Sequence, residues 1–125
     1  KKIREWYCGD GAASTPTVEG TFKVQNRGYY FDSGAARCYW WTQFYGNYLF
    51  HSVLYNKNGT LIDGRVGMAL SHGCVRLEIN NAKWIYDNVS SGTTVRIGDN
   101  LDYPLTNPTR YTWTGGAFGS DPTYR

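Results

Sequence analysis

Short stretches of alternating side chains, separated by Gly, Asn and Asp, dominate the first hundred residues of the chain. Because side chains alternate between the two faces of a strand, such stretches predict β-strands with turns between them. The stretches that we expect to form strands are 2–8, 20–25, 29–31, 38–45, 48–54 and 93–97. In the fifth of these, Leu49, His51 and Val53 are predicted to share one face.

One stretch has the periodicity of a helix. Within 78–91, apolar residues recur at the i, i+3, i+4 and i+7 positions of one helical face. Asn80 is the predicted N-cap and Gly92 the predicted stop. Earlier in the chain, Asn58-Gly59 is a strong signal for a tight hairpin. From Leu101 onward, recurring glycines and prolines predict a loop-rich tail.

Length and composition restrict the class of protein. The 125 residues are enough for one domain, 1–125, with its own core. The formal net charge of +3 is mild, and the basic residues form no clustered motif, so we expect no nucleic-acid partner. The chain contains no apolar run of membrane-spanning length. It starts with Lys1 and shows no signal peptide, so we expect a monomer or a processed part of a longer chain.

Aromatic residues are concentrated between Cys38 and Phe50. Core packing is the expected role, because aromatic side chains supply much of the buried area of a protein. A groove wall that contacts sugar or peptide is the alternative.

The densest chemistry lies in the stretch 70–77, Leu-Ser-His-Gly-Cys-Val-Arg-Leu. A thiol beside an imidazole can be held as thiolate, which is the nucleophilic form of cysteine. Gly73 allows the backbone to approach a bound carbonyl closely, and the N–H groups that follow can stabilise an oxyanion. Arg76 shares a face with Cys74 if the segment is extended, and its guanidinium suits a substrate carboxylate. The pattern favours cysteine-dependent acyl transfer, although a cysteine in apolar surroundings is often only a small core residue.

The segment 71–77 resembles the signature of the L,D-transpeptidase catalytic domain, a bacterial family that cross-links the cell wall. The family motif places a histidine upstream, which His51 matches. The run 14–22 is similar to the Thr-Pro-x-Gly-x-Phe run of the family, and Asp121-Pro122-Thr123 resembles its closing residues. The resemblance implies a mainly β fold, a curved mixed or antiparallel β-sandwich with one main helix at about 80–91. It also implies one more strand than this chain offers at its start.

The resemblance assigns the reacting groups. Cys74 is expected to be the nucleophile and His51 the general base, oriented by the backbone carbonyl of Ser52. The N–H groups of Gly73 and Cys74 are expected to form part of the oxyanion hole.

Three further residues have supporting roles. His72 is expected to set local hydrogen bonds, and Arg76 is expected to bind a substrate carboxylate. Ser71 is either a turn residue or a hydrogen bonder beside the substrate. The stretch from Ser52 to Leu70 is longer than the family's usual spacer and is expected to enlarge the mouth of the site.

The implied function is cross-linking of peptidoglycan stem peptides through a thioester, without a cofactor or metal. The implied location is extracytoplasmic, in the bacterial cell wall or envelope, and carbapenem β-lactams are expected to inhibit. An L,D-carboxypeptidase, which passes the acyl group to water, is the main rival. Two further hypotheses are a non-catalytic wall-binding module and a zinc site built from His51, His72 and Cys74.

The cysteine count is odd. One hypothesis pairs Cys8 with Cys38 in a disulfide and leaves Cys74 reactive, which would indicate an oxidising compartment. The alternative is two separate buried thiols.

Overall fold

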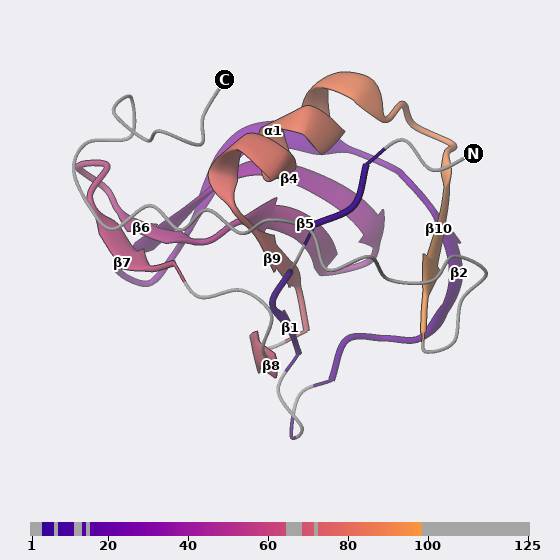
Figure 1. Ribbon diagram of the computed structural model, residues 1–125, viewed down its shortest axis with the longest axis horizontal. Helices are drawn as coiled ribbons and strands as arrows, with labels where there is room; N and C mark the ends of the chain where they lie inside the picture. The colour runs from indigo at the N-terminus through magenta and orange to yellow at the C-terminus, as the bar shows by residue number, and fades with distance from the viewer. Residues whose placement is uncertain are drawn as a thin grey trace.

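The computed structural model describes residues 4–6, 8–11, 14, 16–64, 69–71 and 73–98. Ten strands and one helix lie in this part of the chain, in the order β1 Asp10–Gly11, β2 Gly20–Lys23, β3 Arg27–Ser33, β4 Ala36–Tyr45, β5 Tyr48–Ser52, β6 Leu54–Asn56, β7 Leu61–Asp63, β8 Ala69–Ser71, β9 Val75–Leu77, α1 Ile79–Asn88 and β10 Thr94–Ile97. The expected fold class is confirmed: the chain is mostly β, with a curled mixed sheet and one helix (Figure 1).

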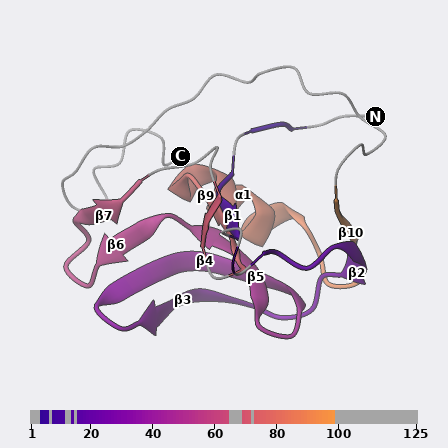
Figure 2. The same ribbon diagram turned by 90° about the horizontal axis from the view of Figure 1, so that it is seen from below.

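The main sheet has six strands. Its hydrogen-bonded order is β7-β6-β4-β5-β9, and β3 pairs with β4. All of these pairs are antiparallel except β5–β9, which is parallel. Two small sheets accompany it, a parallel β1–β8 pair and an antiparallel β2–β10 pair. The β6–β7 hairpin and the β2–β10 pair lie at opposite ends of the molecule in both views (Figures 1 and 2).

The helix lies across one face of the main sheet and contacts β4, β5 and β9 (Figure 2). The buried core cluster on this face consists of Tyr39, Val53, Tyr55 and Ile79. The helix covers this face through Ile79 and Ala82, which leaves the other face of the sheet available for a polar site.

The helix is shorter than the sequence predicts. It is preceded by Glu78, which makes no side-chain cap, and the predicted N-cap Asn80 already lies in the first turn. At the other end Val89 is extended (φ −105°, ψ 107°), so the helix stops before the predicted Gly92. The guanidinium of Arg27 donates to the carbonyl of Tyr86 at 2.8 Å. This donor satisfies one of the carbonyl groups that a helix end leaves unpaired.

Three further sequence predictions can be compared with the structure. The hairpin at Asn58-Gly59 is confirmed by the antiparallel β6–β7 pair, with Gly59 at φ 92°. The strand predicted at 2–8 is wrong for residues 4–6 and 8, which are irregular. Simple alternation predicts that Val53 shares a face with His51, but Val53 packs in the core cluster under the helix. The predicted tail lies outside the described residues, and no described helix has the length and apolar character to cross a membrane.

Candidate active site

Cys74 lies between β8 and β9, at the point where a glycine lets the chain bend. Gly73 has φ 129°, in the region that favours glycine, and a Cβ there would lie 2.7 Å from the ring of Tyr48. The thiol of Cys74 donates to the backbone carbonyl of Asn47 at 3.3 Å. Asn47 belongs to the β4–β5 turn, so two segments that are distant in sequence meet at the sulfur.

The N-terminal segment holds the Cys74 loop on both sides. The amide of Gly9 donates to the carbonyl of Arg76 at 2.8 Å, and the amide of Arg76 donates back at 2.6 Å. The hydroxyl of Thr17 donates to the carbonyl of Gly73 at 2.6 Å and accepts the amide of Gly11 at 2.9 Å. The backbone on either side of the thiol is therefore fixed by hydrogen bonds to residues 9–17.

His51 is 4% exposed and lies on β5, beside Arg76 of β9. Its Nδ1 lies 2.6 Å from the carbonyl oxygen of Ser52. A carbonyl can only accept, so Nδ1 carries the proton and Nε2 keeps its lone pair. Phe31 packs against the imidazole edge-on, with the ring centres 5.3 Å apart. The ring is held in one tautomer and one orientation.

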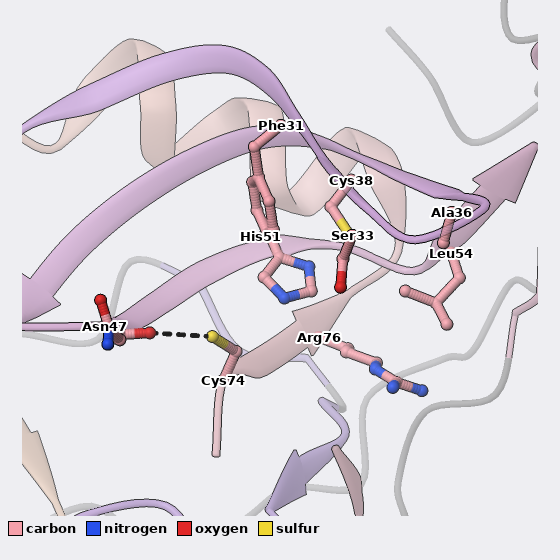
Figure 3. Close-up of a pocket in the computed structure, with 9 residues that line it drawn as sticks. All are labelled: Phe31, Ser33, Ala36, Cys38, Asn47, His51, Leu54, Cys74 and Arg76. Atoms are coloured by element: carbon pink, nitrogen blue, oxygen red, sulfur yellow. Dashed lines mark hydrogen bonds between the residues drawn. The ribbon is translucent and has the colours of Figure 1, made fainter. Parts of the chain in front are cut away.

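Figure 3 shows the imidazole of His51 and the thiol of Cys74 reaching into one cavity. This cavity has a volume of about 430 Å³. It is lined by Phe31, Ser33, Ala36, Cys38, Asn47, His51, Leu54, Cys74 and Arg76.

A second cavity, of about 470 Å³, lies on the side of the β4–β5 turn. Its lining includes Trp41, Gln43 and Leu49 together with the thiol of Cys74. The two cavities share Phe31, Asn47 and Cys74. Cys74 therefore lies where the two cavities adjoin.

The protonation of the site follows from its burial. Burial, opposed by the hydrogen bond to Ser52 and aided by the charge of Arg76, lowers the pKa of His51 to about 4. Burial also raises the pKa of the Cys74 thiol, although the backbone of Leu49 and the charge of Arg76 oppose this. At neutral pH the proton therefore stays on sulfur and the imidazole is neutral. A preformed thiolate, which the sequence suggests, is not favoured here.

Arg76 lies beside the reacting groups, and one of its donor atoms is unpartnered in the described part of the chain. Its Nη1 is 3.7 Å from a carboxylate oxygen of Asp63 on β7, which is an ion pair beyond hydrogen-bond length. Its Nε is buried and has no hydrogen-bond partner in the described part of the chain. The guanidinium is held in place while part of its donor capacity remains unused.

The disulfide hypothesis is not supported. None of the three cysteines forms a disulfide: Cys8 is exposed, Cys38 is buried and Cys74 is partly exposed. Cys38 faces the first cavity from β4, and burial raises its pKa to about 12. The compartment inferred from a disulfide therefore loses its basis, and the alternative of two buried thiols holds for Cys38 alone.

Two predicted site residues cannot be placed. His72 lies outside the described residues, and of Ser71 only the backbone, in β8, is described. Within the described residues no group of three metal-ligating side chains comes together. The zinc alternative needs His72, so it is not tested by this observation.

Four residues near the site were missed by the sequence reasoning as participants: Thr17, Phe31, Asn47 and Asp63. Thr17 stands in the Thr-Pro run that resembles the family, which is its one signal. Asn47 is recognisable in the sequence only as a turn residue. It contacts the thiol through its backbone carbonyl, which every residue type has.

Comparison with known proteins agrees with this geometry. The family model for the L,D-transpeptidase catalytic domain, YkuD, matches residues 1–97. The chain belongs to this family. YciB of Bacillus subtilis (strain 168), which is named as an L,D-transpeptidase, is 39% identical over 99 residues. That alignment covers 70% of this chain and 50% of YciB, so the chain spans about half the length of this relative.

Solved structures show the same fold. A Clostridium acetobutylicum protein, described as a fused Zn-dependent amidase/peptidase with a peptidoglycan-binding domain, is 48% identical with a TM-score of 0.60. The match covers 73% of this chain and 38% of that protein. An L,D-transpeptidase from Mycobacterium smegmatis has a TM-score of 0.62 at 22% identity, covering 77% of this chain and 49% of its own. LdtMt1, solved in complex with imipenem, has a TM-score of 0.61 at 21% identity. The match covers 75% of this chain and 48% of LdtMt1.

Proposed function

We propose that this domain is an L,D-transpeptidase that joins peptidoglycan stem peptides through a thioester on Cys74. The observation that carries the proposal is the meeting of a thiol and a neutral, oriented imidazole in one cavity. Membership of the family supports the same reaction class. Action on peptidoglycan would place the domain outside the cytoplasm, in the bacterial cell envelope.

In the first half-reaction, Nε2 of His51 takes the thiol proton as Sγ of Cys74 attacks the donor carbonyl. The sulfur–carbon bond forms, and the backbone N–H groups of Gly73 and Cys74 stabilise the oxyanion. The carbon–nitrogen bond then breaks, and the leaving amine takes the proton from His51. The product is a thioester on Cys74.

In the second half-reaction, an amine of a second stem peptide attacks the thioester. His51 takes a proton from this amine, the carbon–sulfur bond breaks, and the thiol is restored. The two cavities that meet at Cys74 support this order, because a donor and an acceptor must both reach the sulfur. Arg76 is proposed to hold a carboxylate of a stem peptide, since its donors are not saturated by Asp63.

The deciding experiment is mass spectrometry of the protein after incubation with a carbapenem. LdtMt1 has been solved with imipenem, and we propose that the drug likewise acylates Cys74 here. One adduct per chain is expected, located on Cys74. Cys74→Ala should take up none, and His51→Ala should react ~10²–10⁴ times more slowly, which is the usual contribution of general-base help.

Cys38 provides a matched control in the same cavity. Its pKa is raised to about 12, so Cys38→Ala should be acylated like the wild type. A chelator should not change the rate. An adduct on Cys38, or uptake by Cys74→Ala, contradicts the proposal. Incubation with a disaccharide-tetrapeptide separates the two enzyme classes: a cross-linked dimer indicates transpeptidation, and a tripeptide product alone indicates carboxypeptidation.

A further inference from the structure

The pairing of the central strands is interrupted beside the candidate base. Backbone pairs join Thr42 to Phe50 on one side and Arg37 to Tyr55 on the other. The first pair joins β4 to β5 and the second joins β4 to β6. Four residues lie between the pairs on each side, 38–41 and 51–54, so the register is the same before and after the interruption. Within the interruption, residues 38–41 of β4 form no ladder pair with residues 51–54.

The alternation of side chains is broken in β4 at this point. Tyr39 belongs to the core cluster under the helix, and the next residue, Trp40, has its ring 5.0 Å from that of Tyr86 on α1. Two consecutive residues of β4 therefore face the helix. Opposite this part of β4, Ser52 at the end of β5 and Val53 between β5 and β6 are 0% and 3% exposed. The interruption coincides with the point where Val53 leaves the face that simple alternation predicts.

The backbone of Trp40, inside the interruption, has an unusual conformation. Among the described residues it is the one non-glycine with a positive φ, at 55°. A bulky residue rarely adopts this conformation, and it persists only where the surroundings hold it. The rings of Tyr29 and Tyr86 lie 4.8 and 5.0 Å from the indole, and Lys83 lies 5.2 Å above it. The indole N–H is buried without a partner, so packing rather than hydrogen bonding anchors the ring.

The interruption decides what the Ser52 carbonyl can bind. The amide of Val53 donates to Leu77 on β9 at 2.8 Å. Because the peptide bond is trans, the carbonyl of Ser52 points the other way, towards β4. In an unbroken ladder it would accept a backbone N–H there. Instead the Ser52 carbonyl accepts a hydrogen bond from Nδ1 of His51 at 2.6 Å. The amide of Tyr39 donates to the side-chain hydroxyl of Ser52 at 2.8 Å.

We propose that Trp40 is a positioning residue for His51. Its left-handed backbone keeps the β4–β5 ladder open, so that the Ser52 carbonyl remains available to fix the proton on Nδ1 of His51. Nε2 then faces the cavity with its lone pair. The inference rests on the proposed function in one respect, that His51 is the base. The tautomer of His51 can be observed without any reaction.

The test compares two variants that lose the same indole. Trp40→Gly keeps access to a positive φ, whereas Trp40→Val strongly disfavours it because valine is β-branched. The ring nitrogens of His51 are observed by ¹⁵N NMR in the unliganded protein, with His51→Gln identifying its signals among the two histidines. Wild type and Trp40→Gly should show the proton on Nδ1. Trp40→Val should shift the proton partly or wholly to Nε2.

Carbapenem acylation gives a second measurement. Trp40→Gly should react within about threefold of wild type, and Trp40→Val at least about tenfold more slowly, because the wrong tautomer cannot act as base. If Trp40→Val does not fold, Trp40→Asn and Trp40→Leu form an equivalent pair, since asparagine tolerates the left-handed region and leucine does not.

The outcomes are separable. An unchanged tautomer in the valine or leucine variant overturns the inference, and so does an equal loss in both members of a pair, which would assign the effect to the ring. If wild type shows Nδ1–H but forms no thioester, the proposed function fails while the positioning role stands. If the wild type is acylated but the tautomer of His51 is the same in every variant at position 40, only the positioning role fails.

Discussion

The hydroxyl of Thr17 donates a hydrogen bond of 2.6 Å to the carbonyl of Gly73, across 56 positions of the chain. The same oxygen accepts the amide of Gly11 at 2.9 Å. One side chain thus links the N-terminal segment to the residue that precedes the candidate nucleophile. A shift of Gly73 would move both the thiol and the N–H groups proposed for the oxyanion.

Removing this hydroxyl is expected to impair both stability and reaction. Thr17→Val keeps the shape but leaves an amide and a carbonyl without their partner, which typically costs about 1–3 kcal/mol when such groups are buried. Acylation by a carbapenem should slow by roughly 10- to 100-fold, because small displacements of reacting groups have effects of this size. Urea denaturation and adduct mass spectrometry measure the two effects. Thr17→Ser retains the hydroxyl and should behave like wild type; equal rates for Val and wild type would refute the role.

Gly73 is expected to resist substitution for two separable reasons. Gly73→Ala places a Cβ 2.7 Å from Tyr48 Cε1 and forces alanine to φ 129°. The double variant with Tyr48→Ala removes the clash but not the strained backbone, which should still cost about 1–3 kcal/mol. The free energy of unfolding of both variants, and of Tyr48→Ala alone, measures the two contributions.

Gly34 offers a matched control for this substitution. Its φ is 60°, and a Cβ there would have no heavy atom within 4 Å. Gly34→Ala should therefore show the cost of the backbone conformation without a clash and without slower acylation. If Gly73→Ala is no more harmful than Gly34→Ala, close packing of Tyr48 against the loop is not important.

The residues that meet at the cavity were predictable, but the protonation of the thiol and the backbone geometry of the site were not. The stretch around Cys74 and the bond from His51 to the Ser52 carbonyl followed from residue types and family resemblance, because they involve neighbours in sequence. The positive φ of Trp40 has no sequence signal, since tryptophan normally favours extended backbone. The bond between Thr17 and Gly73 could not be foreseen either, because only the fold brings these residues together.

Arg76 is expected to act on a carboxylate through its planar fork. Arg76→Lys keeps the charge but loses the bidentate geometry, so kcat/KM for a stem peptide with a free carboxylate should fall by about 10-fold or more. A donor peptide with that carboxylate amidated should react poorly with both proteins and should barely distinguish them. Steady-state kinetics with the two donors provides the measurement. An equal loss with both donors would point instead to the ion pair with Asp63, which Asp63→Asn tests directly.

His51 is expected to make the stability of the domain depend on pH in the acid range. Its pKa falls from 6.5 to about 4 on folding because the ring is buried. Between these two values the unfolded chain binds a proton that the folded chain does not, so stability rises with pH. The penalty is absent above about pH 6.5, grows as the pH falls and is complete near pH 4, where it is on the order of 3 kcal/mol.

The comparison of wild type with His51→Gln isolates this effect, because all other titrating groups are common to both proteins. Urea denaturation at several pH values between 7 and 4 gives the free energy of unfolding of each. The difference between the two proteins should change steadily through this range and level off at both ends, with wild type losing more stability on acidification. A difference that is independent of pH would mean that His51 titrates at the same pH in the folded and unfolded chain. In that case the lowering of the His51 pKa by burial would be refuted.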